Sequence, residues 1–175
     1  PLLIHRRSLM QLRYYCTIVS CGMVLNRKVG LESSGYFHGA PVLNELSLNM
    51  RRHSRMQTVD FRYLPLSTGQ RVLDLGCGEG RHLIGALLAA DVSAVGVDLS
   101  HGDLLTGREK TQDWAVSVNE PRRPMLTQAS GYALPFADHS FDAVICSEVL
   151  EHVPSVARVM QEIDRVLQPG GQLVV

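Results

Sequence analysis

The residues of this sequence best suited to chemistry are a glycine loop and the acid that precedes it. Gly76, Gly78 and Gly80 form a G-x-G-x-G loop two residues after Asp74, which lies in an otherwise apolar run. Glycine allows a tight turn and the close approach of a ligand. An apolar stretch with helical spacing follows the loop, and free N–H groups at a helix N-terminus favour an anionic group. The pattern therefore indicates a ligand-binding loop between a strand and a helix.

The spacing of the loop argues against two common nucleotide-binding motifs. A dinucleotide fingerprint, G-x-G-x-x-G, needs its third glycine at position 81, where this sequence has Arg81. A phosphate-binding P-loop needs G-K-[ST] after the loop, and none follows. A dinucleotide oxidoreductase is therefore disfavoured.

Alternating strand and helix patterns from residue 66 onward predict the elements that position this loop. We expect strands at 71–75, 93–98, 125–129, 141–146 and 172–175, with helices at 79–90, 103–113 and 155–167. Ser100 is expected to cap the second helix. The alternation predicts an α/β fold with a doubly wound, mostly parallel sheet. Ligands bind such sheets at the carboxyl ends of the strands.

Several segments, in the expected order, resemble motifs of the class I S-adenosylmethionine-dependent methyltransferases, in particular a type 11-like domain. They are V-L-D-L-G-C-G-E-G at 72–80, G-V-D-L-S at 96–100, Q-A-S-G-Y-A-L-P-F at 128–136, S-F-D-A-V-I-C-S at 140–147 and E-V-L-E-H-V at 148–153, followed by L-Q-P-G-G at 167–171. The resemblance implies a Rossmann-like methyltransferase fold and S-adenosyl-L-methionine as the cofactor. It implies cofactor contacts at Asp74, Gly76, Cys77, Gly78, Gly80, Asp98, Leu99, Ser130, Gly131 and Ser147.

Two of these positions carry particular roles by resemblance. Asp98 would accept hydrogen bonds from the ribose hydroxyls, although a helix-capping role is the alternative. Ser130 stands where the family often has an aspartate that binds the adenine amino group, and the backbone N–H of Gly131 would meet the ring. A serine is uncharged and has a shorter reach than an aspartate. This departure from the family pattern predicts a weaker cofactor contact.

The sequence does not assign a catalytic residue. The sulfonium of the cofactor already makes its methyl group electrophilic, so a base is needed only when the acceptor must lose a proton. His152 fits either a general base or a hydrogen-bonded structural histidine. We expect no metal site, because a reversed zincin motif needs histidine where Glu148 stands and the cysteines lack metal-ligand spacing.

Charge divides the sequence into a basic segment, 1–55, and a domain, 56–175. The first carries eight Lys/Arg against two Glu, a net charge of +6, and the second carries −6. The basic segment could contact nucleic acid or membrane, or it could pack on the acidic domain or be disordered. Its apolar stretch 14–25 weakly resembles a secretory leader, but Asn-Arg-Lys follows where small residues are expected. Because the cysteines do not suggest disulfides, we expect a cytoplasmic protein. The basic residues are dispersed and not interleaved with aromatic residues, so we expect no nucleic-acid or membrane partner.

Residues before 56 otherwise predict a turn-rich linker at 35–41 and a loose helix at 42–56. At the other end, the family fold continues past the fifth strand with a helix and two more strands, whereas this sequence stops at Val175. We therefore expect the C-terminal strands to be missing and strand 172–175 to be an exposed edge. Two functions remain open. One is a methyltransferase acting on a small molecule, and the other is a non-catalytic S-adenosylmethionine-binding module or truncated remnant.

Overall fold

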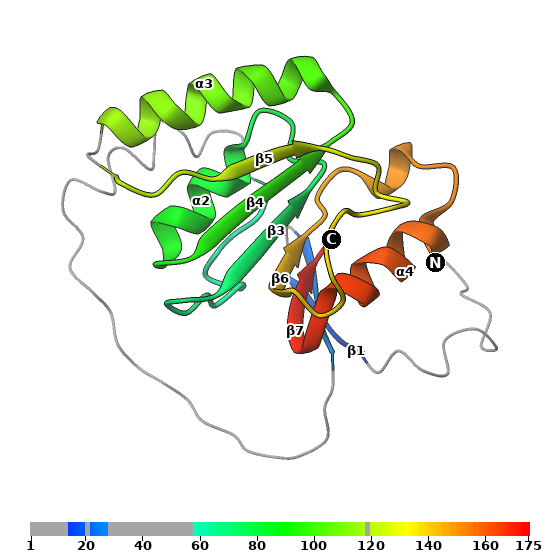
Figure 1. Cartoon of the computed structure of the whole chain (residues 1–175). Coiled ribbons are helices and arrows are strands. Elements are labelled where there is room, and N and C mark those ends of the chain that lie inside the picture. The colour runs from blue at the N-terminus through cyan, green and yellow to red at the C-terminus, as the bar shows by residue number, and fades with distance from the viewer. Residues whose placement is uncertain (1–13, 20–21, 28–57, 118–119) are drawn as a thin grey trace.

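The computed structural model describes residues 14–19, 22–27, 58–117 and 120–175 (Figure 1). Five neighbouring strands of the sheet are parallel, in the order β5-β4-β3-β6-β7. They are β3 (Arg71–Leu75), β4 (Ser93–Asp98), β5 (Met125–Gln128), β6 (Phe141–Ile145) and β7 (Leu167–Val174). The strand order reverses between β3 and β6, so the carboxyl ends of these two strands form the switch point at which doubly wound sheets bind ligands. The predicted α/β fold with a parallel sheet is confirmed.

Helices cover both faces of this sheet, and each face has its own hydrophobic core. Alternate strand residues such as Val72 and Ile145 pack with α2 (Arg81–Ala89) and α3 (His101–Ser117). The residues between them, such as Leu73 and Val144, pack with Val159 and Ile163 of α4 (Val156–Val166). A short 3-10 helix, η2 (Leu150–His152), links β6 to α4. Burial on both faces explains why the central strands are nearly continuous apolar runs.

The predicted boundaries differ from the observed ones by a few residues, for local physical reasons. Helix α2 begins at Arg81 rather than at residue 79, because Gly78 and Gly80 adopt left-handed backbone conformations (φ 49° and 82°). Ser100 caps α3 as predicted, with its Oγ accepting a hydrogen bond from the backbone N–H of Asp103 (3.2 Å). Strand β7 begins at residue 167 rather than 172, since Leu167 already pairs with Phe141 before a register shift in the ladder.

An N-terminal hairpin extends the sheet beyond β7. Strands β1 (Tyr14–Val19) and β2 (Gly22–Arg27) pair antiparallel, and β2 also pairs antiparallel with β7. In that ladder Val24 lies opposite Val174, and Asn26 lies opposite Gln172. The prediction of an exposed fifth strand was therefore wrong, because an unpaired apolar strand is a template for pairing and the β-forming stretch 14–27 occupies it.

The remaining N-terminal predictions, a linker at 35–41 and a helix at 42–56, lie outside the described residues. The predicted domain boundary at residue 56 stays a prediction. Among the described residues, no helix combines the length and hydropathy needed to cross a bilayer.

Candidate functional site

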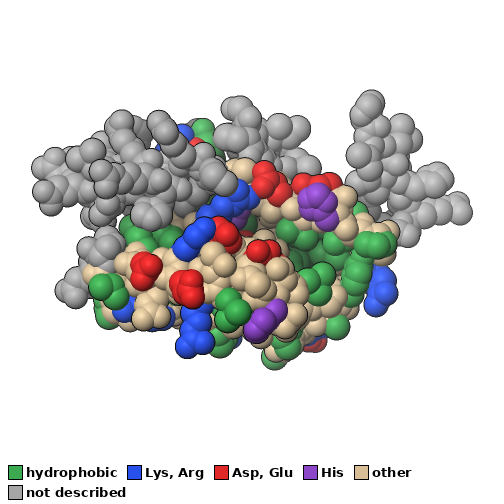
Figure 2. All heavy atoms as spheres, turned by 90° about the horizontal axis from the view of Figure 1, so that it is seen from above, with side chains coloured by type: hydrophobic (Ala, Val, Ile, Leu, Met, Phe, Trp, Pro, Cys, Tyr) green, Lys and Arg blue, Asp and Glu red, His purple; other side chains and the backbone are tan. Residues whose placement is uncertain are grey.

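A cavity of about 240 Å³ opens near the carboxyl ends of the parallel strands. Figure 2 looks down on this side and shows hydrophobic side chains around a hollow, with acidic and histidine side chains beside it. Five of the ten predicted site residues line the cavity: Gly76, Asp98, Leu99, Ser130 and Gly131. They come from three places far apart in the sequence, at the carboxyl ends of β3, β4 and β5 and in the loops that follow them. The fold therefore brings half of the predicted set into one cavity.

Asp98 organises the glycine loop and the start of α3 at the same time. Its Oδ2 accepts a hydrogen bond from the backbone N–H of Gly78 (2.8 Å), and its Oδ1 accepts one from the N–H of Ser100 (2.8 Å). A carboxylate has about four lone-pair positions, so both oxygens can still accept bonds from a ligand in the cavity. The ligand-binding role and the helix-capping role predicted as alternatives are therefore compatible in this geometry.

Gly76 occupies a position that has no room for a side chain. Its φ is 73°, and a Cβ placed on it would lie 2.2 Å from Cγ2 of Val149. The backbone N–H groups of Gly76 and Cys77 both donate to the carbonyl oxygen of Val97 (2.7 and 3.0 Å). The loop is thus anchored to the end of β4 on one side and covered by Val149 on the other.

The other five predicted residues lie beside the cavity rather than in its lining. Gly78 and Gly80 shape the loop, while Cys77 is buried beneath it, and Ser147 follows β6. Asp74 is 1% exposed, and its Oδ2 has no hydrogen-bond partner among the described residues. An unpaired buried carboxylate oxygen is costly unless something else satisfies it.

Neither buried cysteine near the site is a nucleophile. Burial, followed by the nearby carboxylates of Asp74 and Asp98, raises the pKa of the Cys77 thiol far above its ordinary value. Burial and the carboxylates of Asp74 and Glu151 raise the pKa of Cys146 to about 12. Both thiols stay protonated at neutral pH, and nucleophilic reactions of cysteine require the thiolate.

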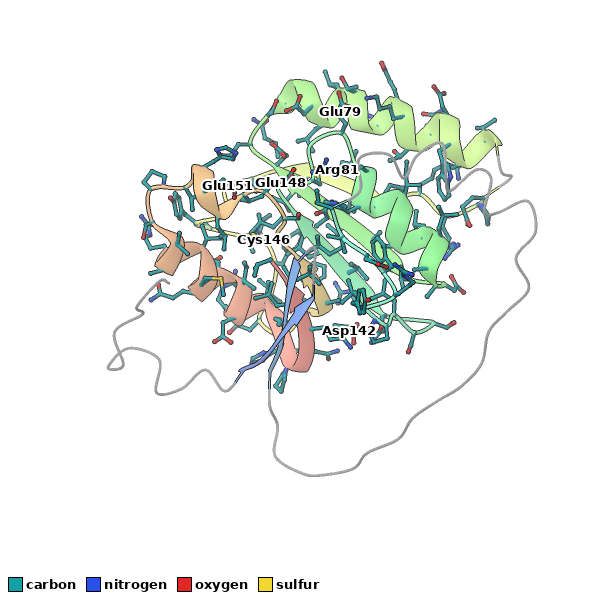
Figure 3. The ribbon with its side chains drawn as sticks, turned by 180° about the vertical axis from the view of Figure 1, so that it is seen from behind. Glu79, Arg81, Asp142, Cys146, Glu148 and Glu151 are labelled. Atoms are coloured by element: carbon teal, nitrogen blue, oxygen red, sulfur yellow. The ribbon has the colours of Figure 1, made fainter. Side chains whose placement is uncertain are left out.

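Sequence reasoning did not place Tyr132, Glu148, Val149 and His152 among the cofactor contacts, yet all four line the cavity. Glu148 adopts a left-handed backbone conformation (φ 57°) and forms an ion pair with Arg81 (2.6 Å) across the rim (Figure 3). Nothing in the residue types of the loop 148–153 signals this conformation, which is uncommon outside glycine. His152 is exposed at the rim, so its role as a base stays a prediction.

Helix α4 holds the loop that carries Ser130. Arg165 donates to the carbonyl oxygens of Leu134 (2.9 Å) and Phe136 (2.7 Å), and it pairs with Glu162 (2.8 Å). Glu162 in turn accepts a hydrogen bond from the N–H of Leu134 (2.7 Å). These charge-assisted bonds fix one wall of the cavity to the helix. Within the described part of the chain, no group of His, Cys, Asp and Glu side chains is arranged to hold a metal ion.

Comparison with known proteins supplies the family. The family model described as a methyltransferase domain matches residues 73–175. A 27-O-demethylrifamycin SV methyltransferase from Amycolatopsis mediterranei is 37% identical over 110 residues, which are 63% of this chain and 39% of that protein. A demethylmenaquinone methyltransferase from Beutenbergia cavernae is 41% identical over 132 residues, which are 74% of this chain and 49% of that protein.

Solved structures agree with this assignment. An arsenic(III) S-adenosylmethionine methyltransferase from Chlamydomonas reinhardtii superposes with a TM-score of 0.55 at 34% identity, covering 61% of this chain and 38% of that one. The YcgJ protein from Bacillus subtilis shares the fold, with a TM-score of 0.54 at 23% identity over 73% of this chain and 47% of that one. The chain spans about two fifths to half of the length of the curated relatives described above. The chain belongs to the class I S-adenosylmethionine-dependent methyltransferases, a family that uses S-adenosyl-L-methionine.

Proposed function

We propose that this chain binds S-adenosyl-L-methionine in the cavity and transfers its methyl group to a small-molecule acceptor. The observation that carries the proposal is the meeting of three loops at the switch point of the sheet. Gly76, Asp98 and Ser130, from the ends of three separate strands and the loops that follow them, line one cavity there. Ligand sites of doubly wound sheets lie at this place in the fold.

The residues present fit this cofactor. The cavity offers apolar walls to a flat base, and Asp98 retains acceptor capacity for ribose hydroxyls. The unpaired Oδ2 of Asp74 lies in a buried carboxylate just before the glycine loop, where a cationic amino group would satisfy it. Ser130 Oγ already accepts a hydrogen bond from the N–H of Tyr132 (3.2 Å), but its second lone pair remains available to accept one from the adenine amino group.

The cofactor supplies an activated methyl group, and the protein residues mainly provide alignment. The glycine loop and Asp98 would fix the ribose, and Val149 above Gly76 excludes water from one side of the loop. The ion pair between Arg81 and Glu148 joins the two loops that flank this end of the sheet. Aligned reactants need a base only when the acceptor must lose a proton, which is consistent with the absence of a fixed base in the motifs.

The names of the relatives support a small-molecule acceptor. Two of them are named for demethylrifamycin and demethylmenaquinone, both small organic molecules. The acceptor of this chain, its cytoplasmic location and the expected absence of nucleic-acid and membrane partners stay predictions.

Calorimetric titration tests the cofactor site. The chain should bind S-adenosylmethionine and its demethylated product, S-adenosylhomocysteine, with micromolar affinity, and it should not bind NADH. Asp98→Asn should weaken both affinities by roughly tenfold or more, because hydrogen bonds to a charged group contribute about 1.5–3 kcal/mol. Asp113→Asn, which changes an exposed acid on α3 away from the cavity, is the matched control and should bind as the parent chain does.

Two results would contradict the proposal. A folded chain that binds neither ligand would lack the cofactor site altogether. Binding that is unaffected by Asp98→Asn would place the cofactor elsewhere. Transfer of a labelled methyl group to a panel of small molecules then separates an enzyme from a non-catalytic binding module, since the module binds the cofactor without turnover.

A further inference from the structure

Four polar side chains form a connected line beneath the glycine loop. Ser147 Oγ lies 2.7 Å from Thr58 Oγ1, and Thr58 Oγ1 lies 3.3 Å from Nε2 of His82. The other ring nitrogen of His82, Nδ1, lies 3.6 Å from Oδ1 of Asp74. The line crosses four segments of the chain: the stretch before β3, the end of β3, the first turn of α2 and the residue after Cys146.

The end of this line formed by His82 and Asp74 is buried. His82 is 3% exposed and Asp74 is 1% exposed, whereas Thr58 and Ser147 are half-buried. Placing a carboxylate and an imidazole together in the core costs solvation free energy, and apolar residues of the same size would often be at least as stabilising. A packing role alone therefore does not explain why these residue types lie there.

The buried carboxylate sets the direction of every hydrogen bond in the line. The ring nitrogen Nδ1 lies 3.6 Å from the carboxylate oxygen. Their interaction is attractive when the nitrogen carries a hydrogen and repulsive when the nitrogen presents a lone pair. In neutral His82 the hydrogen is then on Nδ1, so Nε2 accepts a hydrogen bond from Thr58. Thr58 has a single hydroxyl hydrogen, so it must accept from Ser147. Ser147 thereby uses its own hydrogen and is left with lone pairs only.

We propose that Ser147 accepts a hydrogen bond from the hydroxyl group of the methyl acceptor, and that the line carries away the proton of that hydroxyl. The proposal rests on the proposed function and narrows its acceptor to a molecule methylated on oxygen. Ser147 lies beside the cavity rather than in its lining, between Glu148, which lines it, and the buried Cys146, so the acceptor hydroxyl would reach Ser147 from the cavity. Ser147 is the catalytic residue of this step, while Thr58, His82 and Asp74 are positioning residues behind it.

The step balances as follows. The acceptor oxygen forms a bond to the methyl carbon while the carbon–sulfur bond breaks, leaving its electron pair on sulfur as a thioether. The hydroxyl proton of the acceptor passes to Ser147, the proton of Ser147 passes to Thr58, and that of Thr58 passes to Nε2 of His82. The positive charge lost from the sulfonium reappears on the imidazole, where the carboxylate of Asp74 stabilises it. Of the other charged groups near this end of the sheet, Arg81 and Glu148 pair with each other. The carboxylates of Asp98 and Glu151 lie close enough to raise the pKa of Cys77 and of Cys146, respectively.

The direction of the hydrogen bonds can be measured without any turnover. In the full chain labelled with ¹⁵N-histidine, the ring nitrogen shifts of the neutral form of His82 should show hydrogen on Nδ1 and a lone pair on Nε2. Thr58→Ser keeps a hydroxyl and should preserve this pattern, whereas the isosteric Thr58→Val should shift the Nε2 resonance. Thr106→Val, which removes the hydroxyl of another half-buried threonine on α3, is the control and should leave His82 unchanged. Hydrogen on Nε2 of the neutral ring would reverse the direction of the hydrogen bonds and overturn the proposal.

Turnover gives the second test, with S-adenosylmethionine and paired aromatic probes that carry either a hydroxyl or an amino group at the same ring position. Methylation of the hydroxyl probe should fall by roughly a hundredfold in kcat in Thr58→Val, the usual contribution of an acid–base group. The Kd for S-adenosylhomocysteine should stay within about twofold, because the line of hydroxyl groups acts on the chemical step and not on cofactor binding. Methylation of the amino probe only, hydroxyl methylation that Thr58→Val does not slow, or no turnover of either probe by a cofactor-loaded chain would each contradict the proposal. Failure to bind S-adenosylhomocysteine would instead contradict the proposed function.

Discussion

Replacing Gly76 with alanine should destabilise the chain through two separable effects. The first is the backbone conformation, because φ is 73° and a left-handed conformation costs a residue with a Cβ about 1–2 kcal/mol. The second is contact, because the new Cβ would lie 2.2 Å from Cγ2 of Val149. Overpacking of this kind costs about 1–3 kcal/mol. We therefore expect Gly76→Ala to lower the free energy of unfolding by about 2–5 kcal/mol.

Gly78→Ala is the matched control, because at position 78 the conformational effect is present and the steric contact is absent. Gly78 also has a positive φ, 49°, but no atom lies within 4 Å of a Cβ built on it. Gly78→Ala should lower the free energy of unfolding by the conformational contribution alone, about 1–2 kcal/mol. Urea unfolding of the two variants, followed by circular dichroism, gives the comparison.

A double-mutant cycle with Val149→Ala isolates the contact. Val149→Ala removes Cγ2 and so relieves the clash but not the backbone strain. The free energies of unfolding of Gly76→Ala and Val149→Ala should therefore show a coupling of about 1–3 kcal/mol. Gly78→Ala and Val149→Ala should be additive within about 0.5 kcal/mol. Equal costs for the two glycine variants, or no coupling at position 76, would refute the view that Val149 closes over the glycine loop.

Three further predictions concern ionisation, reactivity and the sheet edge. Hydrogen bonds from Arg122 lower the pKa of Glu120 from 4.5 to about 2, so the stabilisation from this pair is complete above pH 4.5 and is lost as pH falls toward 2. Unfolding measurements should find Glu120→Gln less stable than the parent at neutral pH, with a gap that narrows on acidification; a constant gap would contradict this. With the two N-terminal cysteines changed to serine, native chain should not react with iodoacetamide at Cys77 or Cys146 until urea unfolds it, and rapid native labelling would be the contrary result. Deleting residues 1–28 should speed amide hydrogen exchange along β7, because that strand then loses its ladder with β2; unchanged exchange would argue against the pairing.

Local sequence signals sufficed for the parallel sheet and for the glycine loop. Apolar runs punctuated by Gly76, Gly78 and Gly80 identify β3 and its turn, because both the burial pattern and the positive φ values are properties of a few adjacent residues. The position of Asp98 followed from its place at the end of the next apolar run. Such features need no knowledge of distant contacts.

Features that depend on distant contacts could not be predicted in the same way. The stretch 14–25 has a composition compatible with a strand, a leader or a core segment, and only its pairing with β7 decides among these. The contacts of Thr58 with His82 and Ser147 depend on how α2 is rotated against the sheet. The left-handed backbone of Glu148 lies next to Val149, which packs over Gly76, and the residue type of Glu148 does not signal this conformation.

The hairpin at the sheet edge has a consequence for the order of folding. Strands β1 and β2 are neighbours in the chain and can pair within about 1–10 μs, but β2 meets β7 across about 150 residues. On a ribosome that adds about 5–20 residues per second, β2 waits roughly 7–30 s after its own synthesis before β7 exists. The five parallel strands can assemble around the glycine loop during and just after that interval. Strands β1 and β2, although synthesised before the parallel strands, are then among the last to join the sheet.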